Sequence, residues 1–361
     1  MNICIISHGV HRHTQLLAEG LANRGFKVVL VYFTAKHIFK PRRKFLCVSI
    51  PSNSKLTIYS RLISFRKVHK KLKENIHALI YVGYPVAHLL PVYFSKSIKI
   101  FMPITGPYNV QRNIKSIYYL PYSYMIKYAL KKANLLVTIS KFMKNVYYKV
   151  YKRKSLVIPP PVDETLFKPN FKLKKDNLIL HVARFVPRKG QILAIQMFKK
   201  LKKVHGFKNI KLILAGLYSK EKYFMRVLGE AKKVEGVTVL TNVSDEELVK
   251  LYQSSTVFWW PIIGCEPFGM PPVEAMACGT PVVSFNKPAA NEIISDGVSG
   301  FLANNENDFI ERTISLLVDK KLRRKIQENA INASKKYFTV NISRVWEKVL
   351  RNLYSYKDYY N

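Results

Sequence analysis

The sequence predicts an α/β protein built from two doubly wound domains that face each other across a cleft. Short apolar runs alternate with helical patterns in two series, and a proline-rich break separates the series. The runs are apolar along their whole length, which is typical of parallel strands buried on both faces. A length of 361 residues fits two domains. Ligands of such sheets bind beyond the C-terminal ends of the strands.

The first series is expected to form an N-terminal domain over residues 1–168. Its start reads as strand, helix and strand, with the helical pattern closing at Gly25. Pro159, Pro160 and Pro161 interrupt any regular element, and the polar stretch 168–176 follows, so we place the boundary there. The expected strands are 2–7, 28–32, 78–82, 99–103 and 135–139.

The second series is expected to form a C-terminal domain over residues 169–339. An amphipathic pattern over 340–354 predicts a last helix, and residues 340–361 are expected to pack back onto the first domain. The expected strands are 178–182, 211–215, 237–240, 257–260 and 281–284, and the expected helices are 191–205, 246–252, 271–277 and 309–317.

Composition excludes several classes of protein. Four cysteines without a Cys-x-x-Cys pair indicate neither a disulfide framework nor a zinc site, and they fit a reducing compartment. No Asp-x-Asp and no cluster with metal-ligand spacing occurs, so we expect no metal site. The start lacks the basic flank of a signal peptide. Residues 77–94 contain Gly83, Pro85 and Pro91 and are too short to span a bilayer, so we expect a cytoplasmic protein.

The positive charge is unevenly distributed. The formal net charge is +38, and residues 1–170 hold 29 Lys and Arg against 4 Asp and Glu. Such a field attracts nucleic acid, acidic lipid or phosphorylated substrates. A general lysine bias of the source organism is the alternative explanation.

Two loops carry the candidate chemistry. In residues 264–279, Gly269 and two prolines predict a helix start suited to phosphate or sugar oxygens. Glu266 precedes that helix and Glu274 lies inside it, so each is placed to accept hydrogen bonds from a diol. The alternative is that both are glutamates favoured by the helix dipole. In residues 183–190, Arg184, Arg188 and Lys189 follow a strand, and they form either a diphosphate site or a solvated loop.

The combination of the two loops resembles a known family. The motif Glu-Pro-Phe-Gly-x-Pro-x-x-Glu-Ala-Met-Ala-x-Gly-x-Pro-Val-Val at 266–283 is similar to the signature, with seven residues between its glutamates, of the retaining GT-B glycosyltransferases of family 4, or group 1. Residues 183–190 resemble that family's Gly-Arg-x-x-x-x-Lys-Gly. The resemblance covers nearly the whole chain and is strongest from residue 135 to 303.

The resemblance implies a GT-B fold of two Rossmann-like domains, with the nucleotide-sugar donor in the second and the acceptor in the first. It implies a hexosyltransferase that moves a mannose or glucose type of sugar to a glycan, lipid-linked or other anionic acceptor, without a metal or other cofactor. The resemblance implies that Arg184 and Lys189 bind the diphosphate, and that Glu266 and the N–H groups of Phe268, Gly269 and Met270 bind the sugar. It implies that Glu274 binds the ribose and that the loop Thr241–Ser244, with Val243 and Ser244, contacts the base. Gly9 is implied to lie near the acceptor and the phosphates.

Some positions depart from the family or carry alternatives. His8, Pro160 with Pro161, and Leu217 with Tyr218 stand where the family commonly has glycine or Asn-Gly. His11, His13 and His88 are candidates for acid/base or substrate contacts, although most isolated histidines are not catalytic. Trp259 and Trp260 are expected in a strand core rather than as a sugar platform.

Retention and membrane binding are further expectations. An inverting enzyme usually needs a base near the acceptor, and residues 1–162 hold only two carboxylates, Glu19 and Glu74, although a histidine base remains possible. Residues 59–73 and 112–132 are basic with interleaved apolar residues. They favour peripheral binding to the inner face of an anionic membrane, unless the apolar residues face the core.

Three rival functions differ in class. The charge favours a nucleic-acid-binding or nucleic-acid-glycosylating protein, but no recognised nucleic-acid module occurs. A GT-B epimerase would act on the nucleotide sugar with no acceptor. A Rossmann dehydrogenase lacks support, because no Gly-x-Gly-x-x-Gly follows a strand.

Overall fold

The computed structural model describes residues 1–7, 11–33, 45–50, 76–83, 97–104, 120–173, 177–204, 206–218 and 221–358. It divides the chain into one unit of Met1–Pro161 with Tyr337–Asn361 and another of Val162–Lys336. The sequence placed this boundary at 168/169. Residues 162–168 instead lie with the second unit, because Phe167 is buried against the ring of Tyr252 and Gln253 Nε2 donates to the Lys168 carbonyl at 2.7 Å.

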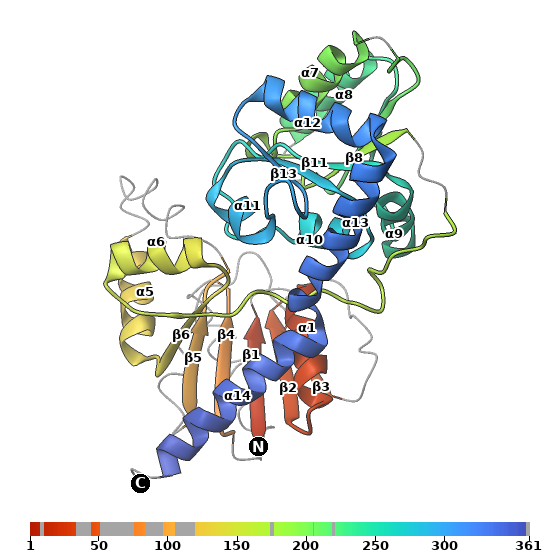
Figure 1. The fold of residues 1–361 in the computed structure, drawn as a ribbon. Helices are drawn as coiled ribbons and strands as arrows, with labels where there is room; N and C mark the ends of the chain where they lie inside the picture. The colour runs from red at the N-terminus through yellow and green to blue at the C-terminus, as the bar shows by residue number, and fades with distance from the viewer. Residues whose placement is uncertain are drawn as a thin grey trace. The chain divides into compact units, whose positions relative to one another are not determined.

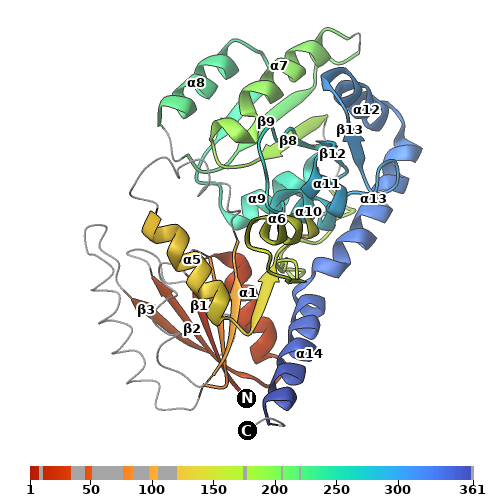
Figure 2. The same cartoon turned by 90° about the vertical axis from the view of Figure 1, so that its left-hand side faces the viewer.

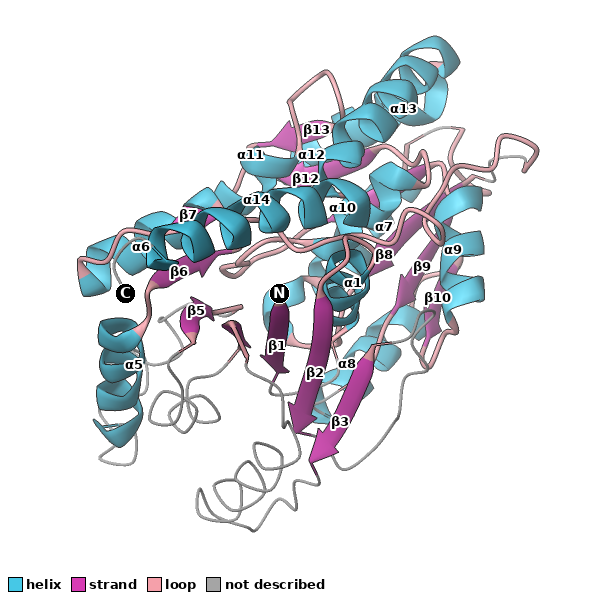
Figure 3. Ribbon diagram, turned by 90° about the horizontal axis from the view of Figure 1, so that it is seen from below, coloured by secondary structure: helices cyan, strands magenta, loops and turns pink. Residues whose placement is uncertain are grey.

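The first unit holds a seven-stranded sheet in the order β3-β2-β1-β4-β5-β6-β7, and its paired strands are parallel (Figure 3). Apolar residues fill β1 and β4 on both faces, as a sheet covered by helices requires. The strands are β1 Asn2–Ser7, β2 Lys27–Phe33, β3 Leu46–Ile50, β4 Ala78–Val82, β5 Ile98–Met102, β6 Leu135–Thr138 and β7 Leu156–Val157.

The described helices of this unit are α1 Arg12–Ala22, α5 Leu120–Lys132, α6 Lys141–Tyr151 and α14 Thr339–Asp358. α14, the last helix of the chain, packs along α1, the first one (Figure 1). Gly20 allows this approach, since a Cβ there would lie 2.7 Å from Ser343 Cβ. Arg24 Nη1 also pairs with Glu347 Oε2 at 2.6 Å. The last helix is therefore part of the first unit.

The second unit holds a six-stranded parallel sheet in the order β10-β9-β8-β11-β12-β13 (Figure 2). The strands are β8 Leu178–Val182, β9 Lys211–Ala215, β10 Val237–Leu240, β11 Val257–Trp260, β12 Val282–Phe285 and β13 Phe301–Ala303. The described α-helices are α7 Gln191–Lys202, α8 Glu221–Lys232, α9 Asp245–Ser254, α10 Met270–Ala277, α11 Pro288–Ile293, α12 Glu306–Val318 and α13 Lys320–Ser334.

The tryptophan pair of β11 lies in the core, as the sequence predicted. Trp259 and Trp260 are 0% and 3% exposed. Trp259 Nε1 donates to Thr313 Oγ1 at 2.9 Å, so its one polar atom is satisfied by α12. Both indole rings are therefore buried in the core of the second unit and cannot stack on a sugar.

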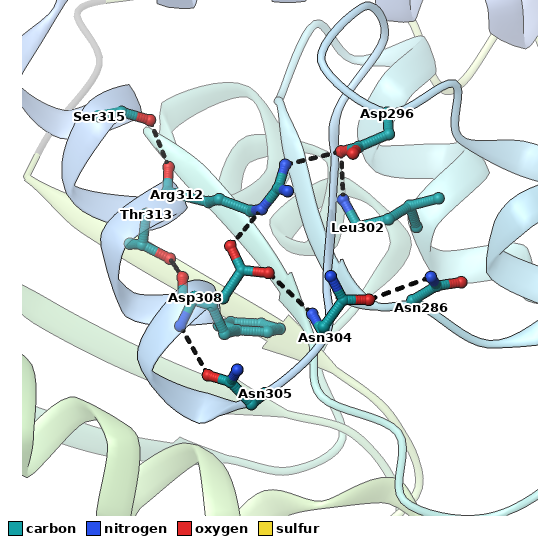
Figure 4. Close-up of polar contacts among 10 residues, drawn as sticks. Asn286, Asp296, Leu302, Asn304, Asn305, Asp308, Arg312, Thr313 and Ser315 are labelled. Carbon is teal, nitrogen blue, oxygen red and sulfur yellow. Dashed lines mark hydrogen bonds and ion pairs between the residues drawn. The ribbon is translucent and has the colours of Figure 1, made fainter.

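A polar cluster fixes the end of the second sheet (Figure 4). Arg312 of α12 pairs with Asp308 through Nε at 2.5 Å and with Asp296 through Nη1 at 2.8 Å. Asp296 Oδ1 also accepts the backbone N–H of Leu302, and Asp308 Oδ2 accepts that of Asn304, both at 2.8 Å. The cluster thus ties the turn before β13, the strand itself and α12 together.

All ten strands expected from the sequence are present within one residue of their predicted ends. The short strands β3, β7 and β13 and the helices α5, α6, α8, α11 and α13 were not predicted. Among the described residues, no helix combines the length and the apolar character that crossing a membrane requires. The basic segment 59–73 and residues 112–119 lie outside the described residues.

Candidate functional site

The loops with the candidate residues follow β8, β9, β10 and β11. These strands are neighbours in one parallel sheet, so the loops leave from the same edge, where doubly wound sheets bind ligands. The loops are residues 183–190, 216–218, 241–244 and 261–269. The second unit therefore assembles the candidate donor residues by itself.

The loop after β8 carries three cations of different exposure. Arg184 is exposed, whereas Lys189 is buried at the end of a 3-10 turn, Pro187–Lys189. Gln191 Nε2 donates to the Arg184 carbonyl at 2.9 Å and steadies the loop. Gly190 adopts φ +77°, and a Cβ there would lie 2.0 Å from the Pro261 carbonyl oxygen. Only glycine lets this loop approach the loop after β11 so closely.

The carboxylate of Glu266 joins these two loops. Its Oε2 accepts from Lys189 Nζ at 2.5 Å and from Arg188 Nη1 at 2.8 Å, across 77 and 78 residues of sequence. The Arg188 carbonyl accepts the N–H groups of Ile263 and Gly264 at 3.1 and 3.2 Å. Both the side chain and the backbone of Arg188 therefore hold the Glu266 loop in place.

The site carries a surplus of positive charge. Burial lowers the pKa of Lys189, the charge of Glu266 raises it, and the neighbouring Arg188 and Arg184 lower it further. Arg188 and Lys189 contact one carboxylate and Arg184 lies in the same loop, so the three cations outnumber that negative charge. A diphosphate would supply the balancing charge, and a partly buried cation interacts with it more strongly than an exposed one.

His181 of β8 lies next to this cluster and was not singled out by the sequence. It is fully buried, and its Nδ1 lies 3.0 Å from the Trp259 carbonyl oxygen. Burial lowers the pKa of His181 to about 4, with the charge of Lys189 contributing. The imidazole is thus neutral at pH 7 and adds no charge beside Lys189.

The start of α10 presents backbone donors at the same edge. Gly269 precedes the helix with φ +136°, and a Cβ there would lie 2.4 Å from the Trp260 ring. Pro271 and Pro272 have no N–H, so Gly269 and Met270 supply the backbone N–H donors at the start of the helix. Phe268, whose N–H was also predicted to contact the sugar, is buried. A helix N-terminus of this kind attracts anionic oxygens.

Glu274 is buried on α10, where it is 8% exposed. Its Oε2 accepts from the hydroxyl of Tyr252 on α9 at 2.9 Å. Tyr252 thereby sets the orientation of the carboxylate. The sequence did not predict this partner, because the contact depends on how α9 and α10 pack.

A pocket of about 410 Å³ opens beside the loop after β10. Val243, predicted to contact the base, lines it together with Glu247 and Lys250 of α9. Ser244 is not among the lining residues: its Oγ accepts the Glu247 N–H at 3.2 Å, and Glu247 Oε2 accepts the Ser244 N–H at 2.8 Å. Ser244 thus caps α9. The remaining lining residues are Leu240, Thr241, Asn242, Leu251 and Ser254.

The other candidates lie elsewhere. Gly9 and His88 are outside the described residues. His11 and His13 belong to the first unit, where their rings stack with centroids 5.3 Å apart. Burial and the charge of His11 lower the pKa of His13 to about 3, so it is neutral at pH 7. In the described parts of the chain, no three His, Cys, Asp or Glu side chains are grouped to hold a metal ion.

Besides His181, the sequence analysis missed the contacts of two residues of the site. Arg188 was noticed as one of the loop cations, but nothing in the pattern indicated that it would hold Glu266. Tyr252 was expected only as part of a helix. Both act through contacts between loops or helices, which spacing along the chain does not reveal.

Comparisons with known proteins agree with this architecture. Residues 162–333 match the model of "Glycosyl transferases group 1", and residues 7–166 match that of "Glycosyltransferase Family 4". Sucrose-phosphate synthase from Thermosynechococcus elongatus superposes with a TM-score of 0.79 at 18% identity, covering 98% of this chain and 99% of that one. Anabaena HepE, solved with UDP and glucose, gives 0.76 at 17%, covering 98% and 100%.

Curated relatives match part of the chain. An uncharacterised glycosyltransferase of Methanocaldococcus jannaschii is 31% identical over 62% of this chain and 59% of its own length. The O-antigen chain mannosyltransferase of Salmonella typhimurium is 28% identical over 58% of this chain and 57% of its own. The matches thus span little more than half the length of these relatives. With both family models matched in succession on two Rossmann-like units, the chain belongs to the GT-B glycosyltransferases of the family 4 type.

Proposed function

We propose that this protein transfers a hexose of the mannose or glucose type from a nucleoside diphosphate sugar to a glycan or lipid-linked acceptor, with retention and without a metal. The observation that carries the proposal is the meeting of Lys189 and Glu266 at the C-terminal edge of the second sheet. A sugar-binding carboxylate and a phosphate-binding cation must lie this close if they act on adjoining groups of one donor.

The diphosphate would bind Arg184 and Lys189. Lys189 would then exchange part of its interaction with Glu266 for a phosphate oxygen. As the bond to the sugar breaks, negative charge grows on the leaving diphosphate, and fixed cations stabilise it in place of a metal. Glu266, still held by Arg188, would be directed to the hexose.

The nucleoside would extend from this cluster along α10 and α9. Glu274, oriented by Tyr252, accepts hydrogen bonds and so suits the two ribose hydroxyls. The pocket at Val243 would take the base. Its volume lies within the usual range for small-molecule sites.

The named relatives support this donor class without selecting a sugar or base. Anabaena HepE was solved with UDP-glucose, and the Salmonella protein is a mannosyltransferase. We therefore keep both glucose and mannose types in the proposal.

Retention is proposed because a carboxylate base is scarce in the acceptor half. Glu19 belongs to α1, and Glu74 lies outside the described residues. The fresh product from an α-linked donor should show an α-linkage by NMR. A β-linkage would reverse this part of the proposal.

A ligand panel tests the donor class. UDP, GDP, ADP and their glucose and mannose derivatives are compared by thermal shift, since a ligand that binds the folded state at a hundred times its Kd stabilises by about 2.7 kcal/mol. One nucleotide series should shift the parent protein and shift Lys189→Ala much less. No shift by any of them would refute the proposal, and sugar conversion with donor alone would indicate an epimerase.

A further inference from the structure

The exposed side of α6 forms a basic surface that the donor site does not use. Lys144 and Tyr148 are one helical turn apart, Lys149 follows on the adjoining side, and all three are exposed. The opposite face buries Met143, Val146 and Tyr147. Past the end of the helix, which is yellow in Figure 1, exposed residues continue through Lys152 and Lys154 to Leu156 in the edge strand β7. We define it as the α6 face: Lys144, Tyr148, Lys149, Lys152, Lys154 and Leu156.

Apolar side chains lie exposed among these lysines. Tyr148 is 49% and Leu156 is 39% exposed. Leu156 begins the strand at one edge of the sheet. An apolar side chain that is exposed to water is not stabilised by that exposure. Its transfer into the apolar layer of a bilayer removes apolar area from water, which is favourable in free energy.

The charge of this region is of one sign. Residues 75–162 contain no Asp or Glu, so no carboxylate of that stretch reduces the positive charge of α6. The described cations of the second unit differ, because several form ion pairs, such as Lys200 with Glu306 and Lys202 with Glu235. The α6 face therefore combines lysines, in a stretch of chain without carboxylates, with exposed apolar area.

We propose that the α6 face docks the protein onto an anionic lipid bilayer. Lysines would lie at the headgroups, and Tyr148 and Leu156 would enter the boundary with the acyl chains. Nucleic acid is the rival partner, because a tyrosine can stack on a base. The exposed aliphatic side chain of Leu156 favours the bilayer. The docking goes beyond the proposed glycosyl transfer and does not depend on the donor site.

The test is sedimentation of the full chain with vesicles. Mixed phosphatidylglycerol and phosphatidylcholine vesicles are compared with phosphatidylcholine alone, at low and high salt. The docking variant carries Lys144→Gln, Lys149→Gln and Lys154→Gln. The matched control carries Lys199→Gln, Lys203→Gln and Lys208→Gln, three exposed positions of the second unit with the same change of charge. Circular dichroism and the nucleotide thermal shift confirm that each variant is folded.

The parent should sediment only with the anionic vesicles and should be released by salt. Each lysine at an anionic surface contributes roughly fivefold to partitioning, so the docking variant, which lacks three of them, should bind about a hundredfold more weakly. The control should lose less than about twofold, and Tyr148→Gln should weaken the binding that remains at moderate salt.

Three results would overturn the inference: no binding to anionic vesicles, equal losses in the docking and control variants, or tighter binding of a single-stranded oligonucleotide through the same lysines. Donor binding is measured separately by the thermal shift. Failure of the docking and failure of the proposed transferase are therefore distinguishable.

Discussion

The two units share one sheet order but carry their cations in different places. In each sheet, the first strand of the unit lies between the second and the fourth: β1 lies between β2 and β4, and β8 lies between β9 and β11. In the second unit, Arg188 and Lys189 converge on Glu266 at the C-terminal edge of the sheet, and Arg184 lies in the same loop. In the first unit, the described lysines of α5 and α6 lie on outer helix surfaces. The same topology thus supports a converging cluster of charged side chains in one unit and a diffuse charged surface in the other.

The difference shows why the fold alone does not assign a function. A diffuse surface exerts its effect through total charge and is screened by salt. A converging cluster acts through the position of individual atoms, so single substitutions should matter there. Four predictions test this contrast.

The largest effect is expected from Lys189→Ala. Removing a buried, charge-assisted contact of about 1.5–3 kcal/mol should lower kcat/KM roughly tenfold to a hundredfold. Activity should persist in excess EDTA, since fixed cations replace the metal. The matched change in the first unit, Lys144→Ala, should leave transfer to a soluble acceptor unchanged. Equal losses in the two variants, or strict dependence on Mg²⁺, would contradict the contrast.

A smaller effect is expected from Glu274→Gln. The amide keeps the shape of the side chain but replaces one acceptor oxygen by a donor, so the donor should bind about tenfold more weakly. Calorimetry with the nucleotide measures this, and an unchanged melting temperature shows that the fold is intact. Tyr252→Phe is the control, because it keeps the carboxylate and removes only the 2.9 Å contact that orients it. Unchanged nucleotide affinity in Glu274→Gln would refute the ribose assignment.

The strands were predictable because they are apolar, short and regularly spaced. β1, β4, β8, β9, β10 and β11 occupy the expected residues. β7 has two residues and exists only through its pairing with β6, so no local pattern indicates it. α13 was missed because its core contact rests on Ile326 and Ala330 within a strongly charged sequence. Local periodicity thus finds the elements that bury a wide apolar face.

The sequence predicted which residues meet at this edge of the sheet but not the contacts between them. Glu266 and Lys189 were recognised from their separate motifs, and the strand order brings the two motifs to one edge. The hydrogen bond of Arg188 to Glu266 arises from the turn of the loop at Gly190 and its approach to residues 261–264. Ser244 shows the reverse case, since a residue assigned to the ligand forms the cap of α9.

Arg188→Gln sharpens the distinction between binding and positioning. Arg188 touches Glu266 rather than the expected ligand path, so its loss should mainly lower kcat, by about fivefold, and change the KM for the donor less. Arg188→Lys should restore part of kcat, because it keeps a cation beside Glu266. A change in KM alone would indicate that Arg188 binds the diphosphate itself.

The smallest effect concerns acid stability, where the two units should behave alike. Burial holds the pKa of His181 at about 4 in the second unit and that of His13 at about 3 in the first. An unfolded histidine titrates near pH 6.5, so below that pH the unfolded state binds a proton that the folded state rejects. The stabilisation is therefore complete above about pH 6.5 and declines as the pH falls toward 4, by about 1 kcal/mol per histidine at pH 5.5.

Urea unfolding at pH 7.5 and 5.5 measures this term in the parent, His181→Asn and His13→Asn. Carboxylates contribute equally to all three proteins, so the difference in pH dependence isolates each histidine. Each variant should lose about 1 kcal/mol less than the parent between the two pH values. If only His181→Asn changes the pH dependence, burial keeps the histidine neutral in the second unit, where His181 lies beside Lys189, but not in the first. An unchanged pH dependence in both variants would show that neither imidazole is held neutral by burial.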